Sequence, residues 1–190
     1  MSVSRSRKLL PSRILLILLT AAAFPVTVNA DGKGFLAMQG GVAMPSNASA
    51  TFAYGVVFVY KPGANFGVGA FLNKYGNGLD TESDTSTIST SSSNFWWGFE
   101  GDYFFKGSLN NFHGGVRMGF LSVSTEGTAT DTTSGASFSI SEASTRFFVG
   151  PKLAYDYMMG RWSVGAELSW MISFGGPKTI YFFPSVKFWF

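Results

Sequence analysis

The segment that most restricts the possible folds is residues 180–190, IYFFPSVKFWF, with which the chain ends. In a β-strand, side chains alternate between two faces, so every second residue of this segment shares a face. One face is wholly apolar and is formed by Ile180, Phe182, Pro184, Val186, Phe188 and Phe190. The other face carries the polar groups of Tyr181, Ser185 and Lys187. A soluble strand would need a partner to cover the apolar face, whereas a lipid bilayer would cover it directly.

The start of the chain has the features of a secretory signal peptide. A basic region (residues 5–13) precedes an apolar stretch (residues 14–24), and a small-residue cleavage site ends at Ala30. A transmembrane anchor is the weaker alternative, because a spanning helix needs about 20 apolar residues and a proline interrupts this stretch early. We therefore expect residues 1–30 to be a signal peptide that is cleaved after Ala30, and residues 31–190 to form one domain.

The charge balance changes when that leader is removed. Of 14 Lys and Arg residues, four precede position 31, so 10 remain against 11 Asp and Glu and the net charge becomes −1. The basic pI of the whole sequence therefore gives no reason to expect nucleic acid binding. The chain has no cysteine, which excludes a disulfide framework and a thiolate metal site. No apolar stretch near 18 residues follows Ala30, so a membrane-embedded domain must be a closed β-barrel.

Eight runs of alternating character follow one another along residues 31–190. The clearest internal run places Phe95 and Trp97 on one face and Glu100 and Asp102 on the other. The runs cover residues 35–44, 51–60, 66–75, 95–105, 112–120, 146–157, 162–173 and 180–190. Such lengths and alternation are typical of transmembrane β-strands. The sequence therefore predicts an all-β fold, an eight-stranded antiparallel up-and-down barrel.

The links between the runs alternate in length. The two long links are residues 76–94 and 122–144, whereas the links at 61–65, 106–111 and 158–161 are short. Because outer-membrane barrels have short periplasmic turns and longer extracellular loops, we expect both termini in the periplasm. Both long links are rich in Ser and Thr, so we expect mobile tips, together with strands that extend beyond the membrane.

A soluble eight-stranded barrel such as a lipocalin is the main structural alternative. The aromatic residues favour a membrane barrel, because bilayer interfaces attract aromatic rings at two levels, whereas a soluble barrel has no reason to band them. The level next to the short turns contains Tyr60, Phe66, Tyr103, Phe105, Phe112, Tyr155, Tyr157, Trp162, Phe188 and Phe190. The opposite level contains Phe52, Phe95, Trp97, Phe147 and Trp170.

With these features the chain resembles the small OmpA-like and OmpX-like outer-membrane barrels of Gram-negative bacteria. The resemblance rests on the signal peptide, the eight runs and the terminal strand ending at Phe190, and it covers essentially all of residues 31–190. In that family the C-terminal aromatic strand is the assembly signal read by the barrel-insertion machinery, which assigns this role here to Phe188 and Phe190. We further expect a monomer in the outer membrane, in contact with its lipids, including lipopolysaccharide.

Hairpin geometry pairs opposite charges on the inward face. Facing residues of an antiparallel hairpin have numbers with a constant sum, so one short turn places Glu100 opposite Arg117 and the next places Lys152 opposite Glu167. Lys187 is expected at the level of Glu167, which completes an interior charge layer of five residues. A gate or ion path is the functional interpretation of this layer. A plug of paired charges is favoured, because an eight-stranded barrel has room only for side chains and buried charges need partners.

Catalysis and metal binding have little support in the sequence. His113 is the only histidine and lies on the inward face near a short turn, away from the Ser-rich links, so a Ser–His–carboxylate arrangement is not expected. No cluster of metal ligands is recognisable, and we expect no cofactor. The favoured hypothesis is a non-enzymatic barrel whose Ser/Thr-rich loops serve envelope integrity, adhesion or shielding. A narrow channel for water or small solutes is the alternative, and a lipid-modifying enzyme is a third.

Overall fold

The computed structural model describes residues 33–83, 86–106, 111–131 and 133–190. The expected signal peptide and its cleavage point at Ala30 lie outside these residues. Eight strands are formed: β1 (Gly34–Pro45), β2 (Thr51–Tyr60), β3 (Phe66–Ser83), β4 (Ser86–Phe104), β5 (Phe112–Asp131), β6 (Ser137–Met159), β7 (Trp162–Ser173) and β8 (Lys178–Trp189). The described residues contain no helix of the length and apolarity that crossing a membrane requires.

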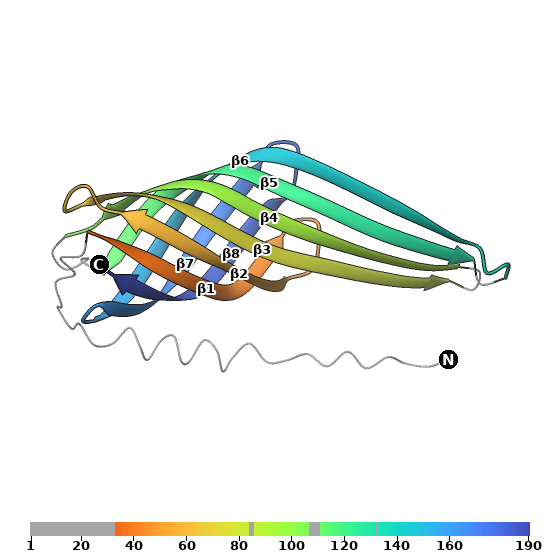
Figure 1. Ribbon diagram of the computed structural model, residues 1–190, viewed down its shortest axis with the longest axis horizontal. Coiled ribbons are helices and arrows are strands. Elements are labelled where there is room, and N and C mark those ends of the chain that lie inside the picture. Colours follow the sequence, from red (N-terminus) through yellow and green to blue (C-terminus); the bar gives the residue numbers. More distant parts are fainter. Residues whose placement is uncertain (1–32, 84–85, 107–110, 132) are drawn as a thin grey trace.

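The eight strands form one closed antiparallel barrel (Figure 1). Each strand pairs with its neighbours in sequence, and β1 also pairs with β8. At this seam Gly34 and Phe190 exchange two backbone hydrogen bonds, of 3.2 and 3.1 Å between nitrogen and oxygen. Closure leaves no sheet edge open around the barrel body. The predicted eight-stranded antiparallel barrel is confirmed.

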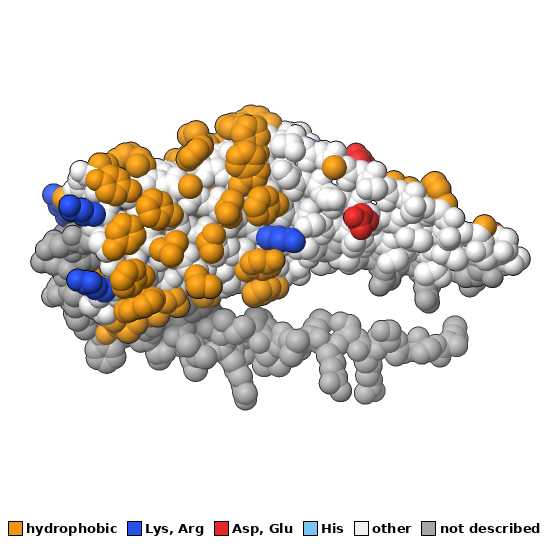
Figure 2. All heavy atoms as spheres, viewed as in Figure 1, with side chains coloured by type: hydrophobic (Ala, Val, Ile, Leu, Met, Phe, Trp, Pro, Cys, Tyr) orange, Lys and Arg blue, Asp and Glu red, His pale blue; other side chains and the backbone are white. Residues whose placement is uncertain are grey.

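Side chains alternate between the lumen and the exterior, as two strands illustrate. In β4, Phe99 is 69 % exposed whereas Trp96 and Glu100 are 0 and 3 % exposed, and in β8, Val186 is 48 % and Lys187 1 % exposed. On the face shown in Figure 2, exposed apolar side chains form a broad band that covers the barrel and stops short of the extended strands. The barrel exterior is therefore apolar where the surface of a soluble protein is mixed.

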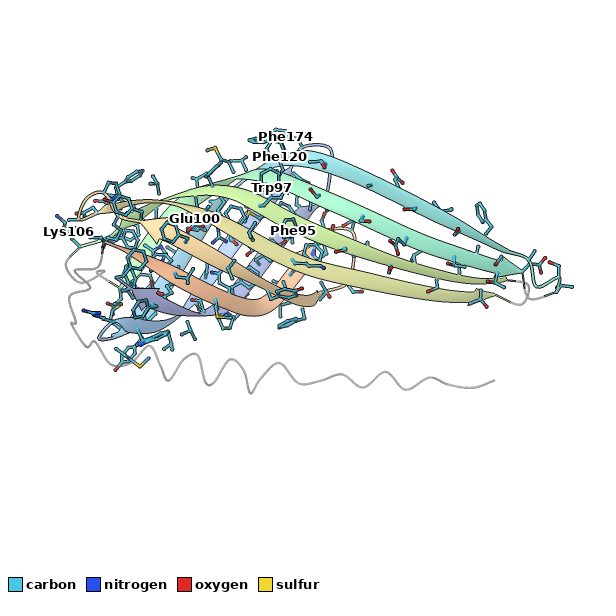
Figure 3. All side chains as sticks on the ribbon, in the orientation of Figure 1. Phe95, Trp97, Glu100, Lys106, Phe120 and Phe174 are labelled. Carbon is cyan, nitrogen blue, oxygen red and sulfur yellow. The ribbon has the colours of Figure 1, made fainter. Side chains whose placement is uncertain are left out.

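Aromatic side chains mark both ends of this band. At the end far from the short turns, the ring centroids of Trp97, Phe120, Phe147 and Phe174 follow one another at 5.1, 5.9 and 5.8 Å. Figure 3 shows three of these rings together at that level, and Lys106 at the opposite end of the barrel. Next to the short turns, the ring pairs are Tyr103–Phe105, Phe112–Tyr155 and Trp162–Phe188. Aromatic rings thus lie at two levels, as predicted, although Phe120 and Phe174 were not among the residues predicted for the level far from the short turns.

Strands β3 to β6 continue beyond the barrel body as a four-stranded sheet (Figure 1). We call the described residues of 76–94 and 122–145 the protruding sheet. Their pairing is unbroken out to Ser83↔Ser86 and Thr130↔Ser137. Residues 76–94 and 122–144 are therefore not loops over most of their described length, and the expected prolongation of the strands is confirmed. These residues bury little surface area, but each one continues a hydrogen-bonded ladder that begins in the barrel. Their many threonines also favour strands.

The hairpin between β6 and β7 is tighter than predicted. Its turn contains only Gly160 and Arg161. Gly160 has a φ of 69°, the positive value that a two-residue turn requires at its first position and that glycine adopts without strain. Lys152 consequently lies opposite Ser169, so the prediction that it lies opposite Glu167 is wrong by two residues.

The protruding sheet is expected to be dispensable for barrel formation, because its strands pair only with one another. We predict that replacing residues 78–91 and residues 126–141 each by an Asn-Gly turn, which preserves the register, leaves a folded barrel. The measurement is the difference in gel mobility between unboiled and boiled protein in detergent. As a control, deletion of residues 68–71 and 98–101 from the barrel wall should abolish that difference. Loss of the difference in the first variant would contradict the prediction.

Candidate functional site

Eight titratable side chains lie together inside the barrel, and we call them the lumen charge cluster. Its members are Glu100, Asp102, His113, Arg117, Lys152, Asp156, Glu167 and Lys187, each at most 5 % exposed. They come from β4 to β8, so the cluster forms only when these strands curve around the lumen. Figure 3 places Glu100 in the half of the barrel next to the short turns. An unpaired buried charge costs several kcal/mol, so these groups require one another.

Arg117 is the centre of the cluster. Its Nε donates to Glu100 Oε2 at 2.6 Å, and its Nη1 and Nη2 donate to the two carboxylate oxygens of Glu167, Nη2 at 3.0 Å. The guanidinium also lies over the Phe71 ring, 4.6 Å from its centroid, and Gln39 donates to Glu167 at 3.2 Å. The planar fork of an arginine suits such a two-oxygen contact. The predicted pairing of Glu100 with Arg117 is confirmed.

Lys152 extends the cluster toward the short turns. Its Nζ donates to Glu100 at 2.6 Å and to Asp102 at 2.9 Å, and lies 3.8 Å from Glu167. The expected contact with Glu167 therefore exists, although it is diagonal across the strands. Gly115 lies between Lys152 and Asp102 in the register, and a Cβ atom there would collide with the Asp102 carboxylate. The missing side chain at position 115 lets the lysine reach the acid.

Lys187 forms a second group with Asp156 and His113. Its Nζ donates to Asp156 at 2.8 Å and lies 3.0 Å from His113 Nε2. The same histidine nitrogen lies 3.2 Å from Asp156 Oδ2, and Nδ1 lies 3.7 Å from Asp102 Oδ2. The register of β8 with β7 places Lys187 nearer the short turn than Glu167. The expectation that these two residues share a level is therefore wrong.

Sequence reasoning did not include Asp102, Asp156 or Gln39 among the interacting residues. The alternation alone marks both aspartates as interior, because they share the inward parity of Glu100 and Lys152. The contact of Asp102 with Lys152 depends on the register of β5 with β6, and the contact of Asp156 with Lys187 depends on the registers of β6 with β7 and of β7 with β8. For Gln39, which reaches Glu167 from β1 across the lumen, no local sequence signal was available.

Aromatic rings fill the lumen on both sides of the cluster. Toward the short turns, Phe104 stacks on His113 with a centroid distance of 4.9 Å. Toward the protruding sheet, Trp96 packs edge-on against Phe148 at 4.7 Å and against Tyr181 at 6.0 Å. These side chains are at most 9 % exposed. The described lumen is therefore a packed core of the kind expected for eight strands.

The contacts of His113 do not form a catalytic arrangement. Its ring nitrogens face Asp102, Asp156 and Lys187 rather than a serine hydroxyl, and the aromatic layers separate it from both ends of the barrel. A nucleophile within hydrogen-bond reach would be needed for acyl-transfer chemistry. Over the parts of the chain that the structure describes, no three His, Asp or Glu side chains are arranged to hold a metal ion.

The two faces of the protruding sheet differ. On the face that continues the barrel exterior, nearly all side chains of β4 to β6 carry hydroxyl groups: Thr87, Ser89, Ser91, Ser93, Ser122, Ser124, Thr128, Thr130, Ser137, Ser139, Ser141 and Thr145, with Glu126 and Ala143 as exceptions. The face that continues the lumen carries the exposed apolar side chains Ile88, Phe138 and Ile140. The unbroken register keeps each face continuous along the sheet.

The β5–β6 tip of this sheet is held by Asp131. The Asp131 carboxylate accepts hydrogen bonds from the Ser134 hydroxyl at 2.8 Å and from the backbone amides of Thr133 and Ser134 at 2.8 and 3.3 Å. The Ser134 hydroxyl and then these amides lower the pKa of the carboxyl group below its usual value. Gly135 turns the chain with a φ of 70°. The tip thus has a defined hydrogen-bonded structure.

Comparison with solved structures identifies the fold. The protein is similar to Ail, the attachment invasion locus protein of Yersinia pestis, with a TM-score of 0.58 and 10 % identity over 84 % of this chain and 99 % of that chain. It is also similar to a major outer membrane protein from Thermus thermophilus, with a TM-score of 0.52 and 11 % identity over 83 % of this chain and 99 % of that chain. The chain has the fold of the small outer-membrane β-barrels.

At these identities the likeness establishes the outer-membrane barrel fold alone. No protein-family model matches the sequence, and a comparison with curated proteins found no match.

The central position of Arg117 predicts a large effect of its removal. Arg117→Met keeps much of the side-chain length but leaves Glu100 and Glu167 without their closest cation, which we expect to lower the free energy of unfolding by roughly 3–5 kcal/mol. The measurement is the urea midpoint of unfolding in detergent micelles. The matched control is Lys106→Met, at the exposed end of the barrel, which should leave the midpoint unchanged. Equal midpoints for the two variants would show that the cluster does not stabilise the barrel.

Proposed function

We propose that the protein is a non-enzymatic, integral outer-membrane barrel that anchors the protruding sheet at the cell surface. The observation that carries this proposal is the unequal length of the strands. Four consecutive strands have 18 to 23 residues, whereas the other four have 10 to 12. Ten or so tilted residues are enough to span the hydrocarbon core, so the extra length of β3 to β6 lies outside it.

The exterior of the barrel supports insertion in a membrane. Side chains as large as Met38, Phe52 and Phe99 are 71, 68 and 69 % exposed. A bilayer would cover this band and place the two aromatic levels at its interfaces. In water, the same band would drive aggregation.

The difference in turn length supports an orientation. Lys33, Lys61, Lys106 and Arg161 lie at the short-turn end, where β1 begins and β8 ends. The proposed orientation puts this end, with the N- and C-termini of the barrel, in the periplasm, and the protruding sheet outside the cell. The barrel-insertion machinery would then read the β8 segment that contains Phe188 and Phe190.

The role proposed for the protruding sheet is contact, adhesion or shielding. Its exterior face presents regularly spaced hydroxyl groups above the level of the membrane, within reach of lipopolysaccharide sugars and of other surfaces. A monomer suffices for this role, since the barrel closes on itself. A channel and a lipid-modifying enzyme are not favoured, because aromatic layers fill the lumen on both sides of the charge cluster.

The orientation can be tested with single cysteines, because the chain has none of its own. We predict that Ser134→Cys, at the tip of the protruding sheet, is labelled on intact cells by a maleimide coupled to a large polyethylene glycol. Lys106→Cys, at the short-turn end, should be labelled only after the outer membrane is permeabilised. The opposite pattern would reverse the orientation. Labelling of neither site after permeabilisation would show that neither end is exposed.

The assembly role can be tested at the end of β8. Phe190→Asp places a carboxylate on the outer face, and we expect it to lower the amount of heat-modifiable protein in outer-membrane fractions several-fold. Phe174→Asp, which alters another exposed aromatic ring at the other end of the barrel, is the matched control. Because a charge is also costly at a membrane interface, only a loss specific to position 190 supports the assembly role. Normal insertion of Phe190→Asp would count against it.

A further inference from the structure

A pocket of about 500 Å³ lies at the mouth of the barrel, where the protruding sheet leaves the barrel body. Its wall combines the β1–β2 loop, the lumen-side face of β3 to β6 and the β7–β8 loop. The volume is within the range of small-molecule binding sites. Elements far apart in the sequence build this pocket, which shares only Ser91 with the exterior-face residues of the protruding sheet named above.

The pocket is closed toward the lumen. Tyr75 lines it and is only 2 % exposed, and its ring packs edge-on against Tyr181 with a centroid distance of 6.0 Å. Trp96 contacts the other side of this layer, at 6.0 Å from Tyr181. A ligand can therefore enter only from the side of the protruding sheet, and it would stay in the pocket rather than pass through the barrel.

Among the described residues, Arg146 is the only one with a charged side chain that lines the pocket. Its Nη1 donates to the Gly175 carbonyl at 2.5 Å, and it forms no ion pair with any residue that the structure describes. A guanidinium has five N–H donors, so this bond leaves most of them for a ligand. Glu142, the next acid along this face of β6, lies four residues farther out and does not line the pocket.

The β7–β8 loop is shaped to hold this guanidinium. Gly175 has a φ of 71°, and a Cβ atom on Gly176 would lie 2.7 Å from Arg146 Nη1, so that a larger residue would displace the side chain. Ser173 closes the loop by donating from its hydroxyl to the Pro177 carbonyl at 2.7 Å. The position of Arg146 is thus fixed by backbone geometry rather than by an acidic partner.

The remaining lining is uncharged and rich in hydrogen-bonding groups. It includes Asn47, Ser49, Thr90, Ser92, Asn94 and Thr125. Hydroxyl and amide side chains both donate and accept, which suits a ligand that carries several hydroxyl groups. One guanidinium without a competing acid suits a single negative charge and pairs with a planar carboxylate through two parallel bonds.

We propose that the mouth pocket binds a carboxylated sugar, with Arg146 pairing with the carboxylate and the Ser, Thr and Asn side chains contacting the hydroxyl groups. The ligand could be a free uronic acid or the acidic end of a surface glycan. Binding depends on the folded barrel and not on its cellular location. A failure of this proposal can therefore be distinguished from a failure of the proposed function.

The test is calorimetric titration of the full-length barrel in detergent micelles with D-glucuronate, D-glucose and inorganic phosphate. We expect saturable binding of D-glucuronate and at least tenfold weaker binding of D-glucose, because a charge-assisted hydrogen bond contributes about 1.5–3 kcal/mol. Absence of D-glucuronate binding, equal affinity for D-glucose, or tighter binding of phosphate would overturn the proposal. A polyuronate oligosaccharide distinguishes the two sources of ligand. Tighter binding than that of D-glucuronate would indicate a surface glycan, because further sugars would then also contact the pocket.

Variants locate the binding in the pocket. Arg146→Gln should weaken D-glucuronate binding about tenfold or more and leave D-glucose binding unchanged. Lys178→Gln, which removes an exposed cation at the same end but outside the pocket lining, should retain the wild-type affinity. Equal losses in the two variants would assign the binding to general surface charge and overturn the site. A difference in gel mobility between unboiled and boiled protein verifies that each variant is folded. If a variant fails to fold, the comparison of the three ligands on the wild-type protein tests the proposal.

Discussion

The backbone ladder between β1 and β8 is the constraint on which the rest of the structure depends. Once these strands pair, every strand of the barrel body has two neighbours, and no backbone edge requires water. Closure also separates the two faces of all strands into an exterior and a lumen. The exterior positions carry mostly apolar side chains, whereas the lumen holds the charge cluster between layers of aromatic and other apolar side chains. The barrel is therefore apolar on its exterior and combines a polar cluster with aromatic layers in its core.

The polar core is held by pairing rather than by hydrophobic burial alone. Four carboxylates face Arg117, two lysines and His113, and Arg117 contacts acids from both β4 and β7. Such a cluster stabilises the barrel only when all of its strands are in register, since a missing partner leaves a buried charge. The aromatic layers around it exclude water and complete the filling of the lumen. We therefore place the proposed contacts with other molecules at the end of the barrel that carries the mouth pocket and the protruding sheet.

Much of this arrangement could be predicted from alternation. The parity of Phe95 and Trp97 against Glu100 identifies inside and outside, and the sum rule pairs Glu100 with Arg117, because that turn is bounded by clear runs. The rule failed for Lys152, since one glycine, Gly160, made the turn shorter than its composition indicated. A different prediction failed for residues 76–94, which were expected to form a loop, because weak burial does not prevent a strand that prolongs an existing ladder. The partners of Lys187 could not be predicted, because they depend on contacts across the lumen between strands distant in sequence.

The most direct test of a closed barrel in a membrane is a spin-label scan along β4. Single cysteines at positions 91 to 103 of this cysteine-free chain would be labelled in reconstituted vesicles and their accessibility to oxygen and to a water-soluble nickel chelate measured. The account predicts that odd positions from 95 to 103 are accessible to oxygen and shielded from nickel, that even positions there are shielded from both, and that positions 91 and 93 are accessible to nickel. Nickel accessibility at odd positions from 95 to 103, or a pattern without period two, would contradict it.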